Sequence, residues 1–301
     1  MKRITTFMFL MAMVAIGAQA QLLYKISGNG LTAPSYIIGT YHVAPVSFVD
    51  SISGIRQVLA DVEQVYGELD MTDLLSGDNM QKMQAAMMLP EGTTLTSLLS
   101  ENETSRLNAR LREVMGVDMT NPMVAQQLNQ LSPMTLSTQL SLLNFMKKTP
   151  GFDPTNLFDS YFQKVATEQG KGVGGLESLE FQIKMLYQGK SLERQKELLM
   201  CQVDNWDFME QMTDNVIKAF FNQDLNAIKE AMDMKMDSSC DSTPEEEAQL
   251  IDDRNANWLQ QMPAIMQAKP TLFAVGAGHL PGDKGVLHLL KTAGYSVEGV
   301  K

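Results

Sequence analysis

The stretch SYIIGTYHVAPVSFVDSISGIRQVLADVEQVYGELDM, residues 35–71, decides the expected fold. Residues 35–40 are mostly apolar and read as a strand, and in residues 64–71 the side chains alternate as they do along a strand. The apolar residues between them follow the i, i+3, i+4, i+7 spacing of an amphipathic helix: Ile55, Val58, Leu59 and Val62. A strand, a helix and a strand within about 35 residues predict a βαβ unit, with a parallel pair of strands and a right-handed crossover.

The segments on either side of this unit extend the same pattern. Residues 22–27 read as a strand that a Gly-Asn-Gly turn joins to residues 35–40. Further strands are predicted at 171–176, 271–276 and 295–300, with helices through 188, from about 192 to 236, over 245–268 and over 282–293. This alternation predicts an α/β fold with a mostly parallel sheet core and helices on both faces. Ligands bind at the carboxyl ends of the strands in such folds.

A helical insertion is expected between the two halves of this core. Residues 73–165 are rich in Met, Leu, Gln and Ser and are interrupted by prolines, which is typical of several short helices. We therefore expect one α/β domain over 21–301 with an inserted helical cap at about 73–165. Another helix start is predicted near Pro244, with Ser242 or Thr243 as its N-cap.

Composition and charge exclude several classes of protein. The chain has 301 residues, of which 44% are hydrophobic and 20% charged, as in ordinary folded proteins. Its formal net charge is -11 and its pI is about 4.8. A surface of this sign repels phosphate backbones, so we expect no nucleic-acid partner.

Residues 1–20, MKRITTFMFLMAMVAIGAQA, resemble a secretory signal peptide. Lys2 and Arg3 precede a short apolar run, and Ala18-Gln19-Ala20 fits a small-x-small cleavage site. The apolar run is shorter than the about 20 residues that span a bilayer, and no later segment is apolar enough to do so. We therefore expect cleavage after Ala20 and a periplasmic or secreted protein with no stable membrane span in the mature chain.

The sulfur-containing residues give weaker signals. Cys201 and Cys240 lack the spacing of a zinc site, and an oxidising compartment permits a disulfide between them, which we favour over two free thiols. The 23 methionines include the run Met232-Asp233-Met234-Lys235-Met236, and thioethers suit Cu(I). We interpret the methionines as fillers of cores and grooves instead.

Two of the three histidines end the same pattern. Gly39-Thr40-Tyr41-His42 and Gly276-Ala277-Gly278-His279 each follow an apolar strand. Glycine lets the backbone turn tightly and come close to a bound group, so Gly39, Gly276 and Gly278 are candidate substrate-binding residues. We expect both imidazoles at the carboxyl edge of the sheet, as half of a metal site or as a base with an orienting partner.

Acidic and basic residues complete the candidate site. Glu68 ends a mostly apolar strand, where a carboxylate is costly to bury unless it is paired or bound to a cation. Two histidines and one carboxylate can hold a metal ion that activates water, and Asp70 is the alternate ligand. Arg254 is a candidate for stabilising an oxyanion or holding a carboxylate. Glu177 is either a helix-start carboxylate or a site residue, and His288, on a helix without a glycine turn, is interpreted as structural.

Five segments resemble the TraB/GumN (TraB/PrgY/GumN, TIKI-like) family: GTYHVAP at 39–45, YGELDM at 66–71, GGLESLEFQ at 174–182, DDRNANW at 252–258 and VGAGHLPGDKGVLHLLKTAGYSVEGV at 275–300. The resemblance extends from about residue 22 to 300. It implies an erythromycin-esterase/ChaN-like fold and, by analogy with the TIKI branch, a metal-dependent peptidase. By position its catalytic and metal-binding residues are His42, His279 and Glu68, with Arg254 and Glu177 at further motif positions.

The sequence thus predicts an exported protein with three functional hypotheses open, two of which are hydrolases. In the first, His42, His279 and Glu68 hold a divalent ion such as Mn, Co or Zn, and the substrate is a peptide or a small molecule. In the second, His42 is a general base beside Glu68 in a metal-free, esterase-like reaction. In the third, the cleft of an envelope protein binds a ligand without turnover.

Overall fold

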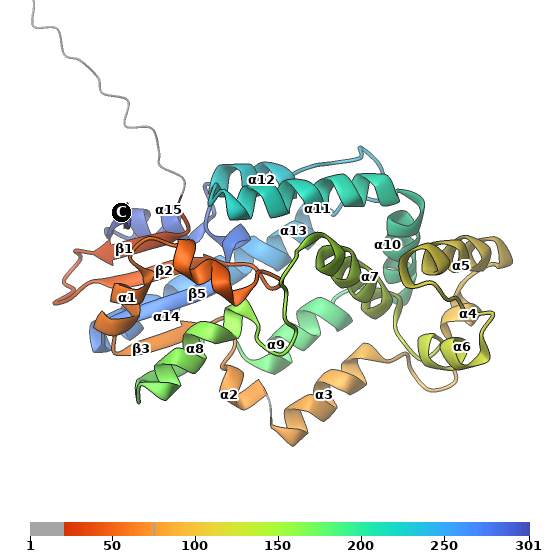
Figure 1. The fold of residues 1–301 in the computed structure, drawn as a ribbon, viewed down its shortest axis with the longest axis horizontal. Helices are drawn as coiled ribbons and strands as arrows, with labels where there is room; N and C mark the ends of the chain where they lie inside the picture. Colours follow the sequence, from red (N-terminus) through yellow and green to blue (C-terminus); the bar gives the residue numbers. More distant parts are fainter. Residues whose placement is uncertain (1–20, 75) are drawn as a thin grey trace, which may run out of the picture.

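The structure is a computed structural model that describes residues 21–74 and 76–301. The leader expected at residues 1–20 lies outside these residues. The centre of the molecule is a six-stranded sheet with the order β4-β3-β5-β2-β1-β6 (Figure 1). Its strands are β1 (Leu23–Ser27), β2 (Ser35–Thr40), β3 (Gln64–Gly67), β4 (Gly172–Gly175), β5 (Thr271–Gly276) and β6 (Ser296–Gly299).

Four of the strands run parallel, which confirms the predicted mostly parallel α/β sheet. β5 pairs with β2 and β3, and β3 pairs with β4, all in parallel. β1 is antiparallel to β2 and to β6. The hairpin between β1 and β2 turns at Gly28, Asn29 and Gly30, all with positive φ, as the Gly-Asn-Gly turn predicts.

β2 and β3 are parallel, but they are not neighbours. β5 lies between them and pairs with both, so the expectation of a directly paired βαβ unit is wrong. The residues from Leu272 to Val275 are buried on both faces of the sheet. A strand that is apolar on both faces suits a central position, which explains why β5 takes the place beside β2.

β3 is shorter than the predicted strand over residues 64–71. It ends at Gly67, because the backbone beyond it bonds to the side chain of Gln163. Gln163 Nε2 donates to Leu69 O at 2.7 Å, and Gln163 Oε1 accepts from Met71 N at 2.9 Å. Glu68 therefore lies just past the strand rather than within it.

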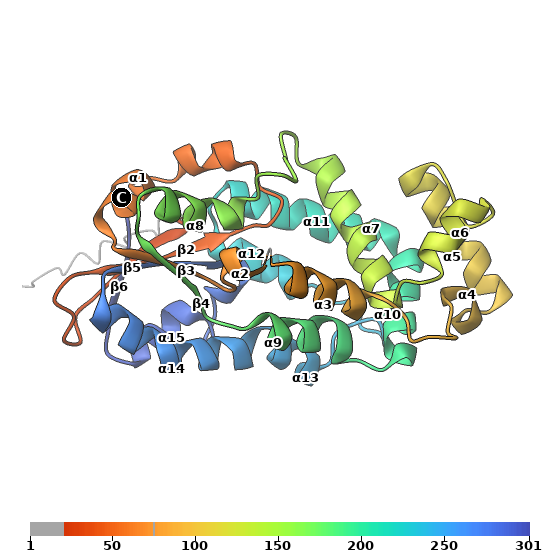
Figure 2. The same ribbon diagram turned by 90° about the horizontal axis from the view of Figure 1, so that it is seen from below.

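Helices cover both faces of the sheet (Figure 2). α1 (Ile55–Asp61) and α8 (Phe158–Glu168) lie on one face, and α14 (Asp253–Ala268) and α15 (Val286–Thr292) lie on the other. Phe162 of α8, Trp258 of α14 and Phe273 of β5 are fully buried in the core between them. Aromatic side chains from helices that are far apart in sequence thus pack on the two faces of the sheet.

A second hydrophobic core lies among the helices beyond the carboxyl ends of the parallel strands (Figure 1). The helices before β4 in this region are α2 (Met71–Leu74), α3 (Gly77–Met87), α4 (Leu95–Leu98), α5 (Glu101–Met115), α6 (Pro122–Leu128) and α7 (Pro133–Lys148). Leu107, Leu111 and Leu140 pack there against Leu199 and Trp206, which come from outside the expected insertion. α8, which begins inside that insertion, packs on the sheet instead.

The second half of the chain is mostly helical, as predicted. The region 192–236 divides into three helices, α10 (Leu192–Asp204), α11 (Trp206–Phe221) and α12 (Leu225–Met232). Thr243 caps α13 (Pro244–Glu247), which confirms the expected helix start. The remaining short elements are α9 (Leu179–Ile183), the π-helical turns η2 (Lys184–Gln188) and η3 (Ala248–Asp252), and the 3-10 helices η1 (Val46–Ser51) and η4 (Ala277–His279).

The two cysteines form a disulfide between α10 and the segment that follows α12. Cys201 and Cys240 are bonded, as favoured by the sequence. Within residues 21–74 and 76–301, no helix is both long enough and apolar enough to cross a membrane.

Candidate active site at the carboxyl ends of the parallel strands

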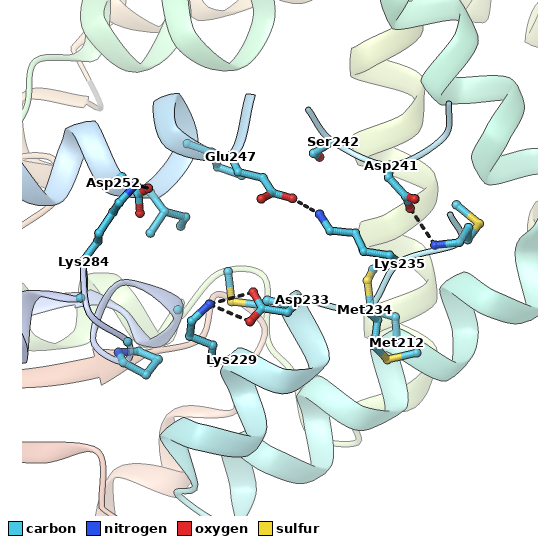
Figure 3. A pocket seen from close by; sticks show the side chains of 18 of the residues that line it. Met212, Lys229, Asp233, Met234, Lys235, Asp241, Ser242, Glu247, Asp252 and Lys284 are labelled. Atoms are coloured by element: carbon cyan, nitrogen blue, oxygen red, sulfur yellow. Dashed lines mark hydrogen bonds and ion pairs between the residues drawn. The ribbon is translucent and has the colours of Figure 1, made fainter. Parts of the chain in front are cut away.

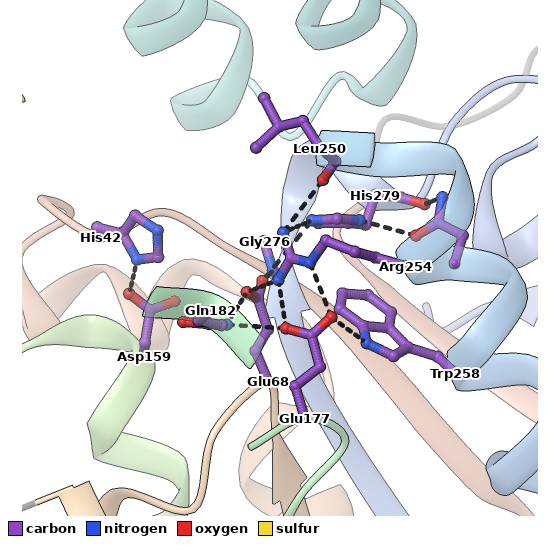
Figure 4. A network of polar contacts seen from close by, with 11 residues as sticks. His42, Glu68, Asp159, Glu177, Gln182, Leu250, Arg254, Trp258, Gly276 and His279 are labelled. Carbon is purple, nitrogen blue, oxygen red and sulfur yellow. Dashed lines mark hydrogen bonds and ion pairs between the residues drawn. The ribbon is translucent and has the colours of Figure 1, made fainter. Parts of the chain in front are cut away.

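The candidate residues follow the carboxyl ends of the four parallel strands. His42 comes two residues after β2, His279 three after β5, Glu68 directly after β3 and Glu177 two after β4. Because these ends are neighbours in the sheet, three of the side chains, Glu68, Glu177 and His279, converge on one buried arginine, Arg254 of α14 (Figure 4). The predicted edge of the sheet is therefore where the polar residues gather.

Arg254 is the centre of this network. Its Nη2 donates to Glu68 Oε2 at 2.5 Å and to Glu177 Oε2 at 2.9 Å, and its Nε donates to Glu177 Oε1 at 2.8 Å. Its Nη1 lies 3.0 Å from His279 Nε2. The side chain is 5% exposed, and although burial disfavours its charge, the two carboxylates raise its pKa. Arg254 therefore holds a positive charge beneath the pocket.

Glu68 is held in its ionised form. Its Oε1 accepts from Gly276 N at 2.8 Å, in addition to the bonds that Oε2 accepts from Arg254 and, at 3.3 Å, from Gln182 Nε2. Burial opposes ionisation, but the charge of His279, which is protonated at low pH, the charges of Arg254 and His42 and the Gly276 N–H outweigh it and lower the pKa of Glu68 to about 2. At neutral pH this carboxylate is an acceptor.

Glu177 lies at the base of the site. Its Oε1 also accepts from Trp258 Nε1 at 2.9 Å, and its Oε2 accepts from Gln182 Nε2 at 2.9 Å. Its side chain is only 4% exposed. Its carboxylate therefore orients Arg254.

The hydrogen bonds of His279 assign its tautomer. Asn255 Nδ2 donates to the carbonyl oxygens of His279 and Lys284, so its Oδ1 is free to accept from His279 Nδ1 at 2.7 Å. His279 Nε2 then accepts from Arg254 Nη1. Burial lowers the pKa of this imidazole to about 4, and the positive charge of Arg254 adds to the effect. His279 is therefore neutral at pH 7, and its Nε2 lies 4.0 Å from Glu68 Oε1.

His42 lies on the opposite side of the same pocket in different surroundings. Its side chain is 78% exposed, and its Nδ1 lies 2.6 Å from Asp159 Oδ2, at the start of α8. The charge of Asp159 raises the pKa of His42 above its ordinary value. In Figure 4 the second ring nitrogen of His42 lies on the side facing Glu68 and Arg254. Of the two glycine–histidine turns, one thus places an exposed imidazole, His42, in the pocket and the other places a buried one, His279.

Both histidines line a pocket of about 340 Å³ with an apolar rim. Leu186 projects from η2 and Leu250 from η3, and both are about 40% exposed. In η3 the π-helical turn loosens the regular helical bonding, and the Leu250 carbonyl accepts from Arg254 Nη1 at 3.2 Å. Two π-helical turns therefore supply the rim, and one of them also holds the arginine.

Other predicted residues have simpler surroundings. Asp70 accepts from the backbone N–H and the hydroxyl of Thr72, which places its carboxylate at the start of α2 and away from the Arg254 network, because β3 has already ended. A Cβ on Gly39 would lie 3.0 Å from Ala277, so β2 packs closely against η4. His288 is exposed on α15, outside the pocket.

Several residues of the site were missed from the sequence. Asn255, Trp258 and Gln182 lie in the motif segments quoted above, and Trp258 follows Arg254 by four residues, so both belong on one face of a helix. That spacing is a signal that could have found Trp258. Asp159 and Gln163 lie in a segment without a motif, and their roles emerge only when α8 packs on the sheet.

The predicted metal ligands line one pocket without surrounding a single point. In the part of the chain that the structure describes, no group of three or more His, Cys, Asp or Glu side chains is placed to hold a metal ion. His279 and Glu68 lie together, His42 lies across the pocket, and Arg254 contacts the nitrogen that would bind a metal.

Known proteins resemble this chain over nearly its whole length. Residues 22–299 match the model of the TraB/PrgY/gumN family. A metalloprotease TIKI homolog of Nematostella vectensis is 26% identical over 90% of this chain and 65% of its own length. Metalloprotease TIKI2 of Danio rerio is 26% identical over 88% of this chain and 58% of its own length. A TIKI homolog of Amphimedon queenslandica is 23% identical over 93% of this chain and 61% of its own length.

The chain spans only about three fifths of the length of these relatives, between 58% and 65%. No solved structure matches it. The family model covers residues on all six strands, including each of the strand ends that bear the site. The chain belongs to the TraB/PrgY/gumN family.

Proposed function

We propose that the pocket between His42 and His279 hydrolyses peptide bonds with the help of a divalent metal ion. The observation that carries the proposal is the state of the two imidazoles. Each has its Nδ1 bonded to an oxygen, of Asp159 or of Asn255, which leaves Nε2 as the nitrogen that can bind a metal. The names of the relatives as metalloproteases support it.

The donors fit a metal such as Zn, Mn or Co in their chemistry. Neutral imidazole nitrogens and a carboxylate are the ligands of catalytic zinc sites. Glu68 is ionised and His279 is neutral, whereas His42, whose pKa Asp159 raises to about 9, would have to release a proton on binding the ion. We propose Glu68, His279 and His42 as the ligands. Arg254 would have to give up its contact with His279 Nε2, and His42 would have to approach from across the pocket. A divalent ion there supplies Lewis acidity that acidifies water and polarises a carbonyl.

The protein's own groups would do the remaining work. Asp159 fixes the tautomer of His42, and Asn255 fixes that of His279. Once Arg254 no longer donates to His279 Nε2, its positive charge would stabilise the developing oxyanion. The apolar rim, which includes Leu186 and Leu250, would exclude water once a substrate is bound. Glu177 holds Arg254 in place, and Gly276 orients Glu68 through its N–H.

A second candidate function is metal-free hydrolysis, in which His42 is the general base. One observation favours it: Arg254 contacts the nitrogen that a metal would need. His42 would act as the base above pH 9, where it is deprotonated, because Asp159 raises its pKa to about 9. The metal-free reaction agrees with the erythromycin-esterase/ChaN-like fold, which we propose for this chain on the resemblance of its motifs.

Export is part of the proposal. A disulfide between Cys201 and Cys240 suits an oxidising compartment, and the leader-like residues 1–20 suit delivery to the periplasm or the exterior.

The test is metal content together with peptide cleavage. We expect the purified protein to hold about one divalent ion per chain and to cleave a peptide library, and a chelator to remove both properties. The double variant His42→Ala/His279→Ala should lose the ion while its circular dichroism spectrum is retained. His288→Asn is the matched control, because this exposed histidine lies outside the pocket.

Equal metal content in the double variant and the wild type would contradict the metal site. Cleavage that resists the chelator but is lost in His42→Ala would favour the metal-free reaction. If no peptide is cleaved by the metal-loaded wild type, the proposed function is wrong.

A further inference from the structure

A second cavity, of about 520 Å³, adjoins the site pocket. It lies between α11, α12, the segment 233–243, η3 and the loop 281–285 (Figure 3). Four residues line both cavities: Met232, Leu250, Ile251 and Gly278. The second cavity therefore begins where the site pocket ends, one residue before His279.

Met232 lies at the boundary between the two cavities. A Cβ on Gly278 would lie 2.6 Å from the Met232 Sδ and 2.8 Å from its Cε, so the thioether packs directly on the backbone of Gly278. Met232 is nevertheless 40% exposed. Its side chain is flexible and polarizable, and methionine surfaces of this kind adapt to apolar partners.

The wall of the second cavity is rich in thioethers, contributed by Met209, Met212, Met232, Met234 and Met236. We call this cavity the methionine cleft. The methionines from 232 to 236 alternate with charged residues at the end of α12, so the run singled out in the sequence as possible copper ligands lines the cleft.

The lysines of the methionine cleft are already paired. Lys229 Nζ lies 2.7 Å from Asp233 Oδ2, and Lys284 Nζ lies 2.7 Å from Asp252 Oδ2. Lys235 pairs with Glu247 (Figure 3). Asp241 and Asp283 also line the cleft, so carboxylates outnumber lysines there and repel an acidic ligand, whereas an apolar side chain can pack on the methionine surface.

We propose that the methionine cleft is the subsite for a large apolar side chain of a peptide substrate, and that Met232 is its specificity-determining residue. The inference rests on the proposed function, because continuity with the pocket of His279 and Glu68 makes a substrate the natural occupant. A peptide lying across Gly278 reaches both cavities at once. An aliphatic side chain next to the scissile bond is buried against Met232, with Leu250 on the other wall.

Binding is measured first, so that the test does not depend on turnover. The protein is labelled with ¹³C at its methionine methyl groups and titrated with the acetylated, amidated hexapeptide Ala-Ala-Leu-Leu-Ala-Ala, whose central bond is replaced by a hydroxyethylene group. The matched probe has Asp-Asp in place of Leu-Leu. We expect saturable shifts for the methyl signals of Met232 and its neighbours in the cleft with the leucine probe and none with the aspartate probe. Met123, which is 74% exposed on α6, should not shift.

Substitution then tests Met232 itself. Met232→Lys should weaken binding of the leucine probe about tenfold or more, the factor expected when burial of one aliphatic side chain is lost, and Met232→Leu should restore it. Met123→Lys is the control for the added charge. In cleavage assays Met232→Lys should raise KM for apolar peptides by a similar factor and change kcat less.

The outcomes separate the two proposals. Equal shifts from both probes, shifts at Met123, or unchanged binding in Met232→Lys would overturn the subsite. Specific shifts in a protein that cleaves no peptide would overturn the proposed function and leave the subsite standing. Cleavage without shifts in the cleft would do the reverse.

Discussion

At the scale of single residues, Arg254 connects the site. Its guanidinium contacts Glu68, Glu177 and His279, which follow three different strands. Two carboxylates this close together and this deeply buried would repel each other without a cation between them. The arginine thus makes it possible to bring the ends of β3, β4 and β5 together with their charges intact.

Replacing this arginine should therefore be costly. In Arg254→Met two buried carboxylates lose their partner, and we expect the free energy of unfolding at pH 7 to fall by about 3–5 kcal/mol. Urea unfolding measures the loss. Arg56→Met is the control: that arginine is 67% exposed in its pair with Asp50, so its replacement should change the free energy of unfolding far less.

The cost should depend on pH in a definite direction. The folded-state pKa of Glu68 is lowered to about 2 from an ordinary 4.5, so its charge stabilises the wild type above pH 4.5 and this stabilisation is lost as the pH falls toward 2. The difference between wild type and Arg254→Met should therefore shrink over that range. A constant difference from pH 7 to pH 3 would contradict the pairing.

The positions of the two histidines could be predicted from the sequence, but their pKa shifts could not. Matching glycine–histidine turns after two apolar strands predict that both imidazoles reach one edge, and both line the same pocket. Their opposite pKa shifts were beyond the sequence, because that of His42 depends on Asp159 of α8 and that of His279 depends on its burial in the folded protein. Motifs located the groups, and tertiary packing set their protonation.

At the scale of elements, α8 and α14 hold the site from the two faces of the sheet. α8 supplies Asp159 to His42 and, one helical turn later, Gln163 to the backbone beyond Glu68. α14 supplies Arg254 and, one turn later, Trp258. In both helices residues four apart lie on one face, so each helix contacts the site at two points.

Gln163 gives a prediction at this scale. In Gln163→Leu the N–H of Met71 and the carbonyls of Leu69 and Gly174 lose their partner, and we expect a destabilisation of about 1–3 kcal/mol. Hydrolytic activity should fall further than stability explains, because the segment after Glu68 loses its anchor. Lys164→Ala, at an exposed position of the same helix, is the control and should change neither. Urea unfolding and peptide cleavage, measured on the same samples, separate the two effects.

At the scale of the whole molecule, the described residues form two separate hydrophobic cores. The sheet core follows the apolar alternation in the sequence, so its strands and flanking helices were predictable. The second core was not, because helices from before β4 pack there against α10 from after it, and sequence periodicity shows which face is apolar but not which helix covers it. The order of the strands was missed for the same reason: β5 comes late in the chain and is inserted between β3 and β2.

The disulfide between Cys201 and Cys240 stabilises the helical half of the molecule. It joins α10 of the second core to the segment that walls the methionine cleft, and the cysteines are 39 residues apart. We expect Cys201→Ser/Cys240→Ser to lower the free energy of unfolding by about 2–4 kcal/mol. Thermal unfolding with and without a reductant measures it: the wild type should become as unstable as the variant when reduced, and the variant should not respond. If full reduction leaves the thermal unfolding of the wild type unchanged, the prediction is wrong.

The place of β5 has a consequence for biosynthesis. Its residues 271–276 fill the middle of the sheet, so β2 and β3 emerge from the ribosome more than 200 residues before the strand that joins them. Contacts at such a separation form late, because the intervening chain must first be ordered. The sheet of the nascent polypeptide therefore cannot be completed until residues 271–276 have been synthesised, which would leave the chain unfolded for long enough to allow the export proposed above.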